Sequence, residues 1–166
     1  MKLFLLRHGI AVEPGTPGFT RDSERPLTPE GRRKTRSIAR ALAGLEVTPD
    51  VILTSPCVRA HQTAEIVATR LRLKKSLQIC EHLACGGDAK RLIAEINRRH
   101  GKAASVMLVG HEPDLSQLAS LLISGQSNGA QIELKKGGLV VLELDDLRAS
   151  RCAVLQWLAP PKLLLR

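Results

Sequence analysis

The sequence predicts an α/β fold, a single three-layer domain over residues 1–166 in which helices cover both faces of a mostly parallel open sheet. Short apolar segments typical of buried strands alternate with longer segments that carry apolar residues at helical spacing. Three of the apolar segments end in polar clusters, at positions 7–8, 55–59 and 110–111. In a parallel sheet such clusters can converge at one edge, where ligands bind.

The first strand–helix unit occupies the N-terminal part of the chain. Residues 3–6 form a continuous apolar run, which is typical of a central strand, and an Arg-His-Gly triplet follows them. Residues 13–26 carry three prolines and two glycines and predict a long surface loop. Thr28 and Pro29 are suited to the N-cap and first position of a helix that ends at Gly44.

The middle of the chain repeats this pattern. A short strand is predicted at 51–54, a helix through residues 60–71 and a further strand at 77–80. Asp88 is suited to cap a helix that Gly101 ends.

The last third begins with a buried strand at 105–109 and a helix over 115–122. Residues 131–158 then predict strands that pair about a turn at 136–138.

The charge of the chain favours anionic partners. Lys and Arg number 25 against 16 Asp and Glu, a formal net charge of +9, which attracts phosphorylated molecules and nucleic acid alike. Proteins that bind single-stranded nucleic acid use aromatic side chains to stack bases, and this chain has three aromatic residues. We therefore expect no nucleic-acid partner.

The cysteines and the N-terminus bear on cofactors and location. Cys80, His82 and Cys85 are close in sequence but lack the second half of a zinc motif, so no metal site and no cofactor are expected. The absence of a C-x-x-C pair favours a reducing compartment, and the N-terminal apolar run is too short for a signal peptide or a membrane span. These features predict a cytoplasmic protein without a membrane partner.

Histidines and arginines at strand ends suit phosphoryl transfer. A neutral imidazole can attack phosphorus to form a covalent intermediate, and arginine's planar fork binds phosphoryl oxygens. Arg7, Arg59, His111 and Arg25 are the natural set to hold the phosphoryl group. Each residue alone also has a simpler explanation: Arg-His-Gly is common by chance, and His111 could cap a helix.

Four motifs together resemble one family. Residues 6–9, Leu-Arg-His-Gly, resemble the RHG signature of the histidine phosphatase superfamily. Residues 55–64, SPCVRAHQTA, are similar to its S-P-x-x-R-A-x-x-T-A segment, and residues 109–113, VGHEP, to its second-histidine motif. Residues 22–28, DSERPLT, with Gly31 beyond, resemble the D-x-x-R-P-L-T-x-x-G block of the small SixA-type phosphohistidine phosphatase branch.

The resemblance implies roles for individual residues. His8 would be the nucleophile, Arg7 and Arg59 would grip the phosphoryl group, and His111 would be the second histidine of the pocket. Arg25 would be the additional phosphate contact of the SixA-type branch. The family's fold would need no metal.

The chain departs from the larger members of the family, which place an acidic proton donor in an inserted segment. Glu81 and Asp88 lie in the nearest corresponding region and are the candidate proton donors. Asp88 is equally suited to cap a helix, and Glu81 can be a solvated surface carboxylate, so the sequence leaves the donor open.

The resemblance implies a phosphohistidine phosphatase that acts through a covalent phospho-His8 intermediate. Its partner would be a phosphorylated protein, for example a histidine-containing phosphotransfer domain, because a short chain leaves the pocket open. One alternative is a phosphatase of small phosphate esters. An alternative from another class is a non-catalytic module that binds phosphate or nucleic acid.

Overall fold

The computed structural model describes residues 1–165, which form a six-stranded sheet in the order β3-β2-β4-β1-β5-β6. Strands β3, β2, β4 and β1 run parallel to one another, whereas β5 is antiparallel to both β1 and β6. The strands are β1 Lys2–Arg7, β2 Val51–Thr54, β3 Leu77–Ile79, β4 Ser105–Gly110, β5 Leu139–Leu144 and β6 Ala153–Ala159.

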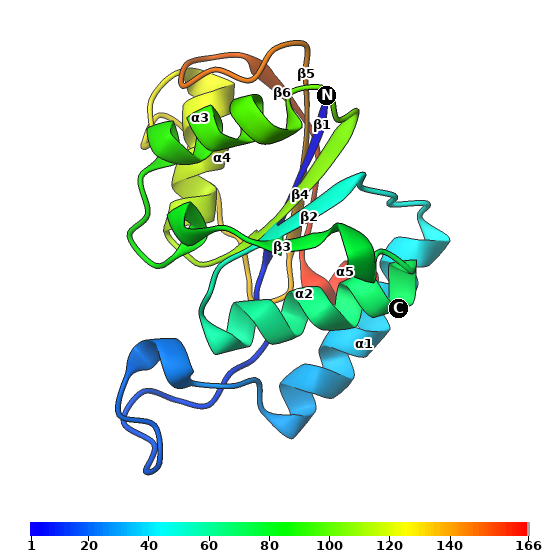
Figure 1. The fold of residues 1–166 in the computed structure, drawn as a ribbon, viewed down its shortest axis with the longest axis vertical. Coiled ribbons are helices and arrows are strands. Elements are labelled where there is room, and N and C mark those ends of the chain that lie inside the picture. Colours follow the sequence, from blue (N-terminus) through cyan, green and yellow to red (C-terminus); the bar gives the residue numbers. More distant parts are fainter. Residues whose placement is uncertain (166) are drawn as a thin grey trace.

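Helices cover both faces of this sheet (Figure 1), which confirms the predicted fold class. One face is covered by α1 Pro29–Gly44, α2 Val58–Leu71 and α5 Pro161–Leu164, and the other by α3 Ala89–His100 and α4 Asp114–Ser124. Among residues 1–165, three single turns of 3-10 helix lie in the connections: η1 Asp22–Glu24, η2 Lys74–Ser76 and η3 Glu81–Leu83.

The central strands explain the continuous apolar runs in the sequence. Leu3 and Leu5 of β1 belong to the core on the α3–α4 side, and Phe4 and Leu6 to the core on the α1–α2 side. Since successive side chains of a strand point to opposite faces, a strand buried on both faces needs apolar residues at every position.

The predicted helix caps are confirmed. The hydroxyl of Thr28 accepts a hydrogen bond from the Gly31 N–H at 2.9 Å, with Pro29 at the first position of α1. The carboxylate of Asp88 accepts from the N–H groups of Lys90 and Arg91 at 2.8 and 3.3 Å at the start of α3. Each cap satisfies backbone donors that the helix itself leaves free.

The C-terminal part differs from the prediction. No strand precedes the turn near residue 137 within residues 131–138, and the paired strands β5 and β6 are joined by residues 145–152. The backbone N–H of Gly137, which has a φ of +80°, donates to the carbonyls of Arg7 and His8 at 3.1 Å each. The glycine turn therefore closes onto the end of β1 instead of joining two strands.

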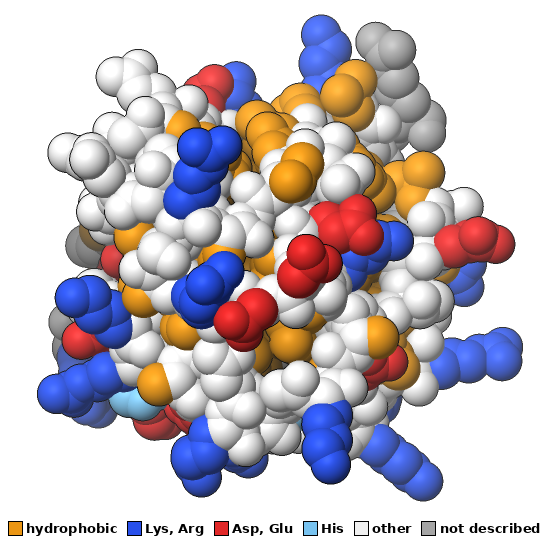
Figure 2. All heavy atoms as spheres, turned by 90° about the horizontal axis from the view of Figure 1, so that it is seen from above, with side chains coloured by type: hydrophobic (Ala, Val, Ile, Leu, Met, Phe, Trp, Pro, Cys, Tyr) orange, Lys and Arg blue, Asp and Glu red, His pale blue; other side chains and the backbone are white. Residues whose placement is uncertain are grey.

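The surface at the end of the molecule where β1 begins carries mixed charge. Figure 2 shows Lys and Arg side chains around the outline of this face with Asp and Glu between them. Charges dispersed in this way are typical of a solvated surface rather than of a single binding patch. Among residues 1–165, no helix has both the length and the apolar character needed to cross a membrane.

Candidate active site

The ends of three neighbouring parallel strands bring the polar clusters together. The His8 N–H donates to the Gly110 carbonyl at 3.1 Å, and the Ser55 N–H donates to the Val109 carbonyl at 3.0 Å. The imidazole rings of His8 and His111 lie with their centroids 5.1 Å apart. Segments that are about fifty residues apart in sequence thus share the carboxyl edge of the sheet, as parallel packing requires.

His8 is a buried imidazole with a defined tautomer. Its Nδ1 lies 2.7 Å from the carbonyl oxygen of Gly9, and only a protonated Nδ1 can donate to a carbonyl. Burial lowers the pKa of His8 to about 3; the hydrogen bond to the Gly9 carbonyl partly offsets this effect, and the charges of Arg59 and Arg7 add to it. The side chain is therefore neutral near pH 7, with the lone pair on Nε2.

Arg59 lies beside that lone pair at the first turn of α2. Its side chain is 4% exposed, and its Nε donates to Nε2 of His8 at 3.3 Å. Its Nη1 and Nη2 donate to the backbone carbonyl and the carboxylate of Asp22, each at 2.7 Å, and Nη2 also contacts Sγ of Cys85 at 3.3 Å. These hydrogen bonds thus fix the orientation of the guanidinium, with its Nε directed at Nε2 of His8.

Asp22 links Arg59 to Arg25. The Nε and Nη2 of Arg25 donate to Oδ1 of Asp22 at 2.9 and 2.6 Å, and its Nη1 donates to the carbonyl of Val12. Hydrogen bonds from Arg25, followed by those from Arg59, lower the pKa of the Asp22 carboxyl. An ionised carboxylate thus bridges two guanidinium groups. Guanidinium groups bind phosphoryl oxygens with the same geometry.

Arg7 and His111 carry polar atoms without partners. The Nη1 of Arg7 donates to the Leu134 carbonyl at 2.9 Å, and Nε2 of His111 lies 2.8 Å from Oγ of Ser55. Arg7 Nε and His111 Nδ1 are buried and have no hydrogen-bond partner among the described residues. Buried polar atoms without partners are rare in folded proteins, and a ligand bound beside these side chains would supply a partner.

The pKa values of these two side chains reflect burial. Desolvation lowers the pKa of Arg7 from its usual value, which the Glu112 charge partly offsets. Desolvation, followed by the charge of Arg59, lowers the pKa of His111 to about 4. The pocket thus contains two neutral imidazoles among arginine side chains.

Comparison with known proteins places this chain in a family. A family model for the histidine phosphatase superfamily (branch 1) matches residues 3–84. Phosphohistidine phosphatase SixA of Escherichia coli is 33% identical over 128 residues, which cover 76% of this chain and 77% of the relative. The chain belongs to the histidine phosphatase superfamily. It is therefore a phosphatase, a hydrolase with a histidine nucleophile.

Two further matches are an uncharacterised protein and a solved structure. An uncharacterised protein of Picosynechococcus sp. is 38% identical over 143 residues, 86% of this chain and 84% of the relative. The solved structure of the protein histidine phosphatase SixA complexed with tungstate matches the fold with a TM-score of 0.83 at 28% identity, and the match covers 98% of both chains.

The two candidate proton donors of this histidine phosphatase lie on exposed segments. Glu81 begins η3, is exposed and makes no side-chain hydrogen bond or ion pair with the described residues. Asp88 caps α3. Hydrogen bonds from the N–H of Arg91 and, second, from the N–H of Lys90 lower the pKa of its carboxyl. The carboxylate that contacts the pocket arginines is instead that of Asp22.

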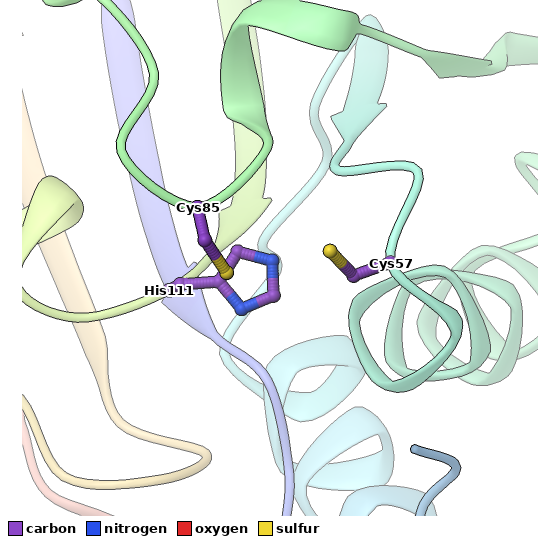
Figure 3. Close-up of side chains that lie close together, drawn as sticks. All are labelled: Cys57, Cys85 and His111. Carbon is purple, nitrogen blue, oxygen red and sulfur yellow. The ribbon is translucent and has the colours of Figure 1, made fainter. Parts of the chain in front are cut away.

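The cysteine–histidine set considered in the sequence is not brought together. Cys80 and His82 both contact Glu95, with Cys80 Sγ and His82 Nε2 each 3.5 Å from its Oε2. Cys85 instead faces Cys57 and His111 in the pocket (Figure 3).

Several residues of the site were not singled out by the sequence. Ser55 holds His111, and Thr63 accepts from the Gly9 N–H at 3.0 Å, which fixes the loop that carries His8. Both lie inside the S-P-x-x-R-A-x-x-T-A segment, as Asp22 lies inside the D-x-x-R-P-L-T block, so the motifs held the signal. Nothing in the sequence pattern connects Cys57 with Cys85.

Proposed function

We propose that this histidine phosphatase removes the phosphoryl group from a phosphorylated histidine of another protein, such as a histidine-containing phosphotransfer domain. The observation that carries the proposal is the geometry of the pocket: Nε2 of His8 lies 3.3 Å from Nε of the buried Arg59, and the rings of His8 and His111 lie with their centroids 5.1 Å apart. Burial lowers the pKa of both imidazoles, which agrees with a neutral nucleophile. The likeness to E. coli phosphohistidine phosphatase SixA supports the same substrate class.

His8 is the nucleophile in this proposal. Its Nε2 lone pair attacks phosphorus and forms a P–N bond while the bond to the substrate's imidazole breaks. The Gly9 carbonyl accepts from Nδ1–H and so stabilises the positive charge that the His8 ring gains. Water then attacks phospho-His8, which releases inorganic phosphate and restores the neutral imidazole.

Arginines bind the phosphoryl oxygens. The Nε of Arg59 already lies 3.3 Å from the attacking nitrogen, so a phosphoryl group on that nitrogen is within its reach. Arg7 contributes an Nε that is buried without a partner, and Arg25 is available once Asp22 releases it. His111 completes the pocket with its unpaired Nδ1. Fixed donors of this kind stabilise the charge of the transition state without a metal ion.

The leaving group favours phosphohistidine as the substrate. When its second ring nitrogen is protonated, a phosphohistidine releases a neutral imidazole whose conjugate acid has a pKa of about 6.5, so this group departs near neutral pH with little help. An alkyl ester expels a much more basic alkoxide, for which a general acid typically contributes about 10²- to 10⁴-fold. The ionised Asp22 has no proton to give, so alkyl esters are expected to react slowly.

A substrate panel tests the proposal. The chain is incubated with a phosphorylated phosphotransfer domain, an aryl phosphate, phosphoserine and a sugar phosphate, and phosphate release is measured. We expect rapid hydrolysis of the phosphotransfer domain and the aryl phosphate and slow hydrolysis of the alkyl esters. Equally efficient hydrolysis of the alkyl esters would favour a phosphatase of small metabolites instead.

The covalent intermediate is tested separately. Trypsin cleavage after Arg7 and Arg21 releases a peptide, residues 8–21, in which His8 is the one histidine. Acid quenching is avoided because phosphohistidine is acid-labile, and the peptide is examined for an added phosphoryl group. We expect the label on this peptide and none in His8→Ala. A label on another peptide would reject His8 as the nucleophile.

A further inference from the structure

Two thiols and an imidazole meet at the rim of the catalytic pocket. One ligand atom from each of Cys57, Cys85 and His111 lies within 4.8 Å of the other two. Figure 3 shows the three side chains turned toward one another from separate segments: the start of α2, the loop after η3 and the end of β4. No other trio of His, Cys, Asp and Glu side chains among residues 1–165 is this close.

The cluster has the composition of a site for a thiophilic metal ion. Zinc is bound by thiolate sulfur at about 2.3 Å and imidazole nitrogen at about 2.0–2.1 Å, and sites with three protein ligands keep a fourth position open. Tetrahedral geometry at these bond lengths separates the ligand atoms by roughly 3.5 Å. The three atoms, which all lie within 4.8 Å of one another, would therefore close by at most about 1.3 Å to bind zinc.

The surroundings permit that closure. Cys85 is exposed, and a side chain at the following Gly86 would meet nothing within 4 Å, so the loop has space in which to adjust. Cys57 and His111 are buried and held by Ser55, whose Oγ accepts from the Cys57 N–H at 3.2 Å and lies 2.8 Å from His111 Nε2. Two of the three ligands are thus oriented in advance by a shared neighbour, as outer-shell residues orient metal ligands.

A second observation, besides the distances within the cluster, concerns His111. His111 is 2% exposed, yet its Nδ1 has no hydrogen-bond partner among the described residues. A buried polar atom left without a partner is costly, and a metal ion or another ligand would satisfy it.

Zinc binding would add no net positive charge beside Arg59. Binding proceeds as two thiols plus Zn²⁺ giving a zinc dithiolate and two protons, so the net charge of the cluster does not change. Arg59, whose Nη2 is 3.3 Å from Cys85 Sγ, then contacts a thiolate instead of a thiol, which strengthens the hydrogen bond.

We propose that Cys57, Cys85 and His111 form an inhibitory site for Zn²⁺ or another thiophilic divalent cation. The bound ion takes up the second histidine of the pocket and the sulfur next to Arg59, so phosphoryl groups bind poorly while the metal is present. The inhibitory effect rests on the proposed function, whereas metal binding by the cluster does not.

Co²⁺ binding tests the site without reference to catalysis. The full chain, kept reduced with a non-thiol reductant, is titrated with Co²⁺, and thiolate-to-cobalt charge-transfer absorption is recorded. We expect one equivalent of Co²⁺ to produce this absorption and Zn²⁺ to displace it. Absence of the absorption in the wild-type chain would overturn the proposal even if the chain hydrolyses phosphohistidine.

Matched cysteine variants connect binding to inhibition. Cys85→Ser removes one exposed ligand, and Cys152→Ser removes a thiol that lies outside the cluster. The readout is the Zn²⁺ concentration that halves each variant's own activity. We expect it to rise more than about 10-fold in Cys85→Ser, since even outer-shell partners contribute about 10- to 100-fold to metal affinity, and to stay unchanged in Cys152→Ser. Equal Zn²⁺ sensitivity in Cys85→Ser and the wild type would reject the site.

Discussion

Replacement of Asp22 by alanine is expected to strengthen the binding of phosphate-like anions to the pocket. The Asp22 carboxylate bonds to Arg25 at 2.6 Å and to Arg59 at 2.7 Å, so an incoming phosphoryl group must take over both guanidinium groups. Arg59 keeps its contacts with the residue-22 backbone carbonyl and with His8 when the carboxylate is removed. Arg25 keeps the hydrogen bond from its Nη1 to the Val12 carbonyl. Both arginines therefore stay in place, and no carboxylate competes with the phosphoryl group for them.

The size of the effect follows from the exposure of the pairs. The Asp22 side chain is 55% exposed, and exposed ion pairs contribute about 0.2–1 kcal/mol each. Two such pairs amount to roughly 0.4–2 kcal/mol, which corresponds to about a 2- to 30-fold change in affinity. Because solvent screens both pairs, we expect a value in the lower part of this range, about 2- to 10-fold.

The assay is the competitive inhibition constant of tungstate, the anion in the solved SixA structure, measured against an aryl phosphate. Glu24→Ala is the matched control, because Glu24 lies on the same turn but pairs with Arg21. It removes the same charge without touching Arg25 or Arg59. Weaker tungstate binding in Asp22→Ala would mean that the carboxylate organises the arginines. If Glu24→Ala strengthened tungstate binding equally, the change in net charge alone would explain the effect.

Further predictions concern catalysis, metal dependence and stability. Arg59→Lys keeps the charge but loses the planar fork, so kcat/KM for phosphohistidine should fall at least about 10-fold, and activity equal to the wild type would remove Arg59 from the proposed grip. Hydrolysis should persist in a chelator, and loss that one divalent ion restores would show that a metal is required. Gly31→Ala should lower the free energy of unfolding, measured in urea, by about 3 kcal/mol, because the new Cβ would lie 1.9 Å from the Ile10 carbonyl oxygen. In the same helix, a Cβ at Gly44 would meet nothing within 4 Å, so Gly44→Ala should raise the free energy of unfolding by about 0.5–1 kcal/mol. The imidazole of His8 should show no NMR titration between pH 5 and 8, since burial lowers its pKa to about 3. The unfolded chain binds more protons at this site below pH 6.5, so His8 should destabilise the fold as the pH falls toward 3; an NMR midpoint near 6.5 would contradict both statements.

The sequence predicted the elements that depend on local patterns. Residues 3–6 and 106–109 are apolar at every position because both faces of the central strands are buried, and this burial is visible in the sequence. The caps at Thr28 and Asp88 are equally local, since a side chain there bonds to N–H groups two or three residues away.

The turn at residue 137 shows where local patterns stop being sufficient. A glycine turn has the same sequence whether it joins two paired strands or closes onto a distant strand. Its partners here, the carbonyls of Arg7 and His8, lie about 130 residues away in the chain. The same holds for the contact of Asp22 with Arg59 and for the approach of Cys85 to Cys57, since each depends on how an irregular loop folds over the sheet edge.

The burial that keeps the two imidazoles of the pocket uncharged also prepares the pocket for a phosphoryl group. Desolvation keeps His8 and His111 neutral and leaves Arg7 Nε without an acceptor, at a cost to the stability of the free protein. A bound phosphoryl dianion supplies that acceptor and, as an opposite charge, raises the pKa of both imidazoles. In the proposed reaction His8 must be neutral before it attacks, and its ring becomes positive as the P–N bond forms. The bound phosphoryl anion then stabilises this positive charge. This difference between the free and the occupied pocket lowers the barrier, because it acts on the transition state more than on the free enzyme.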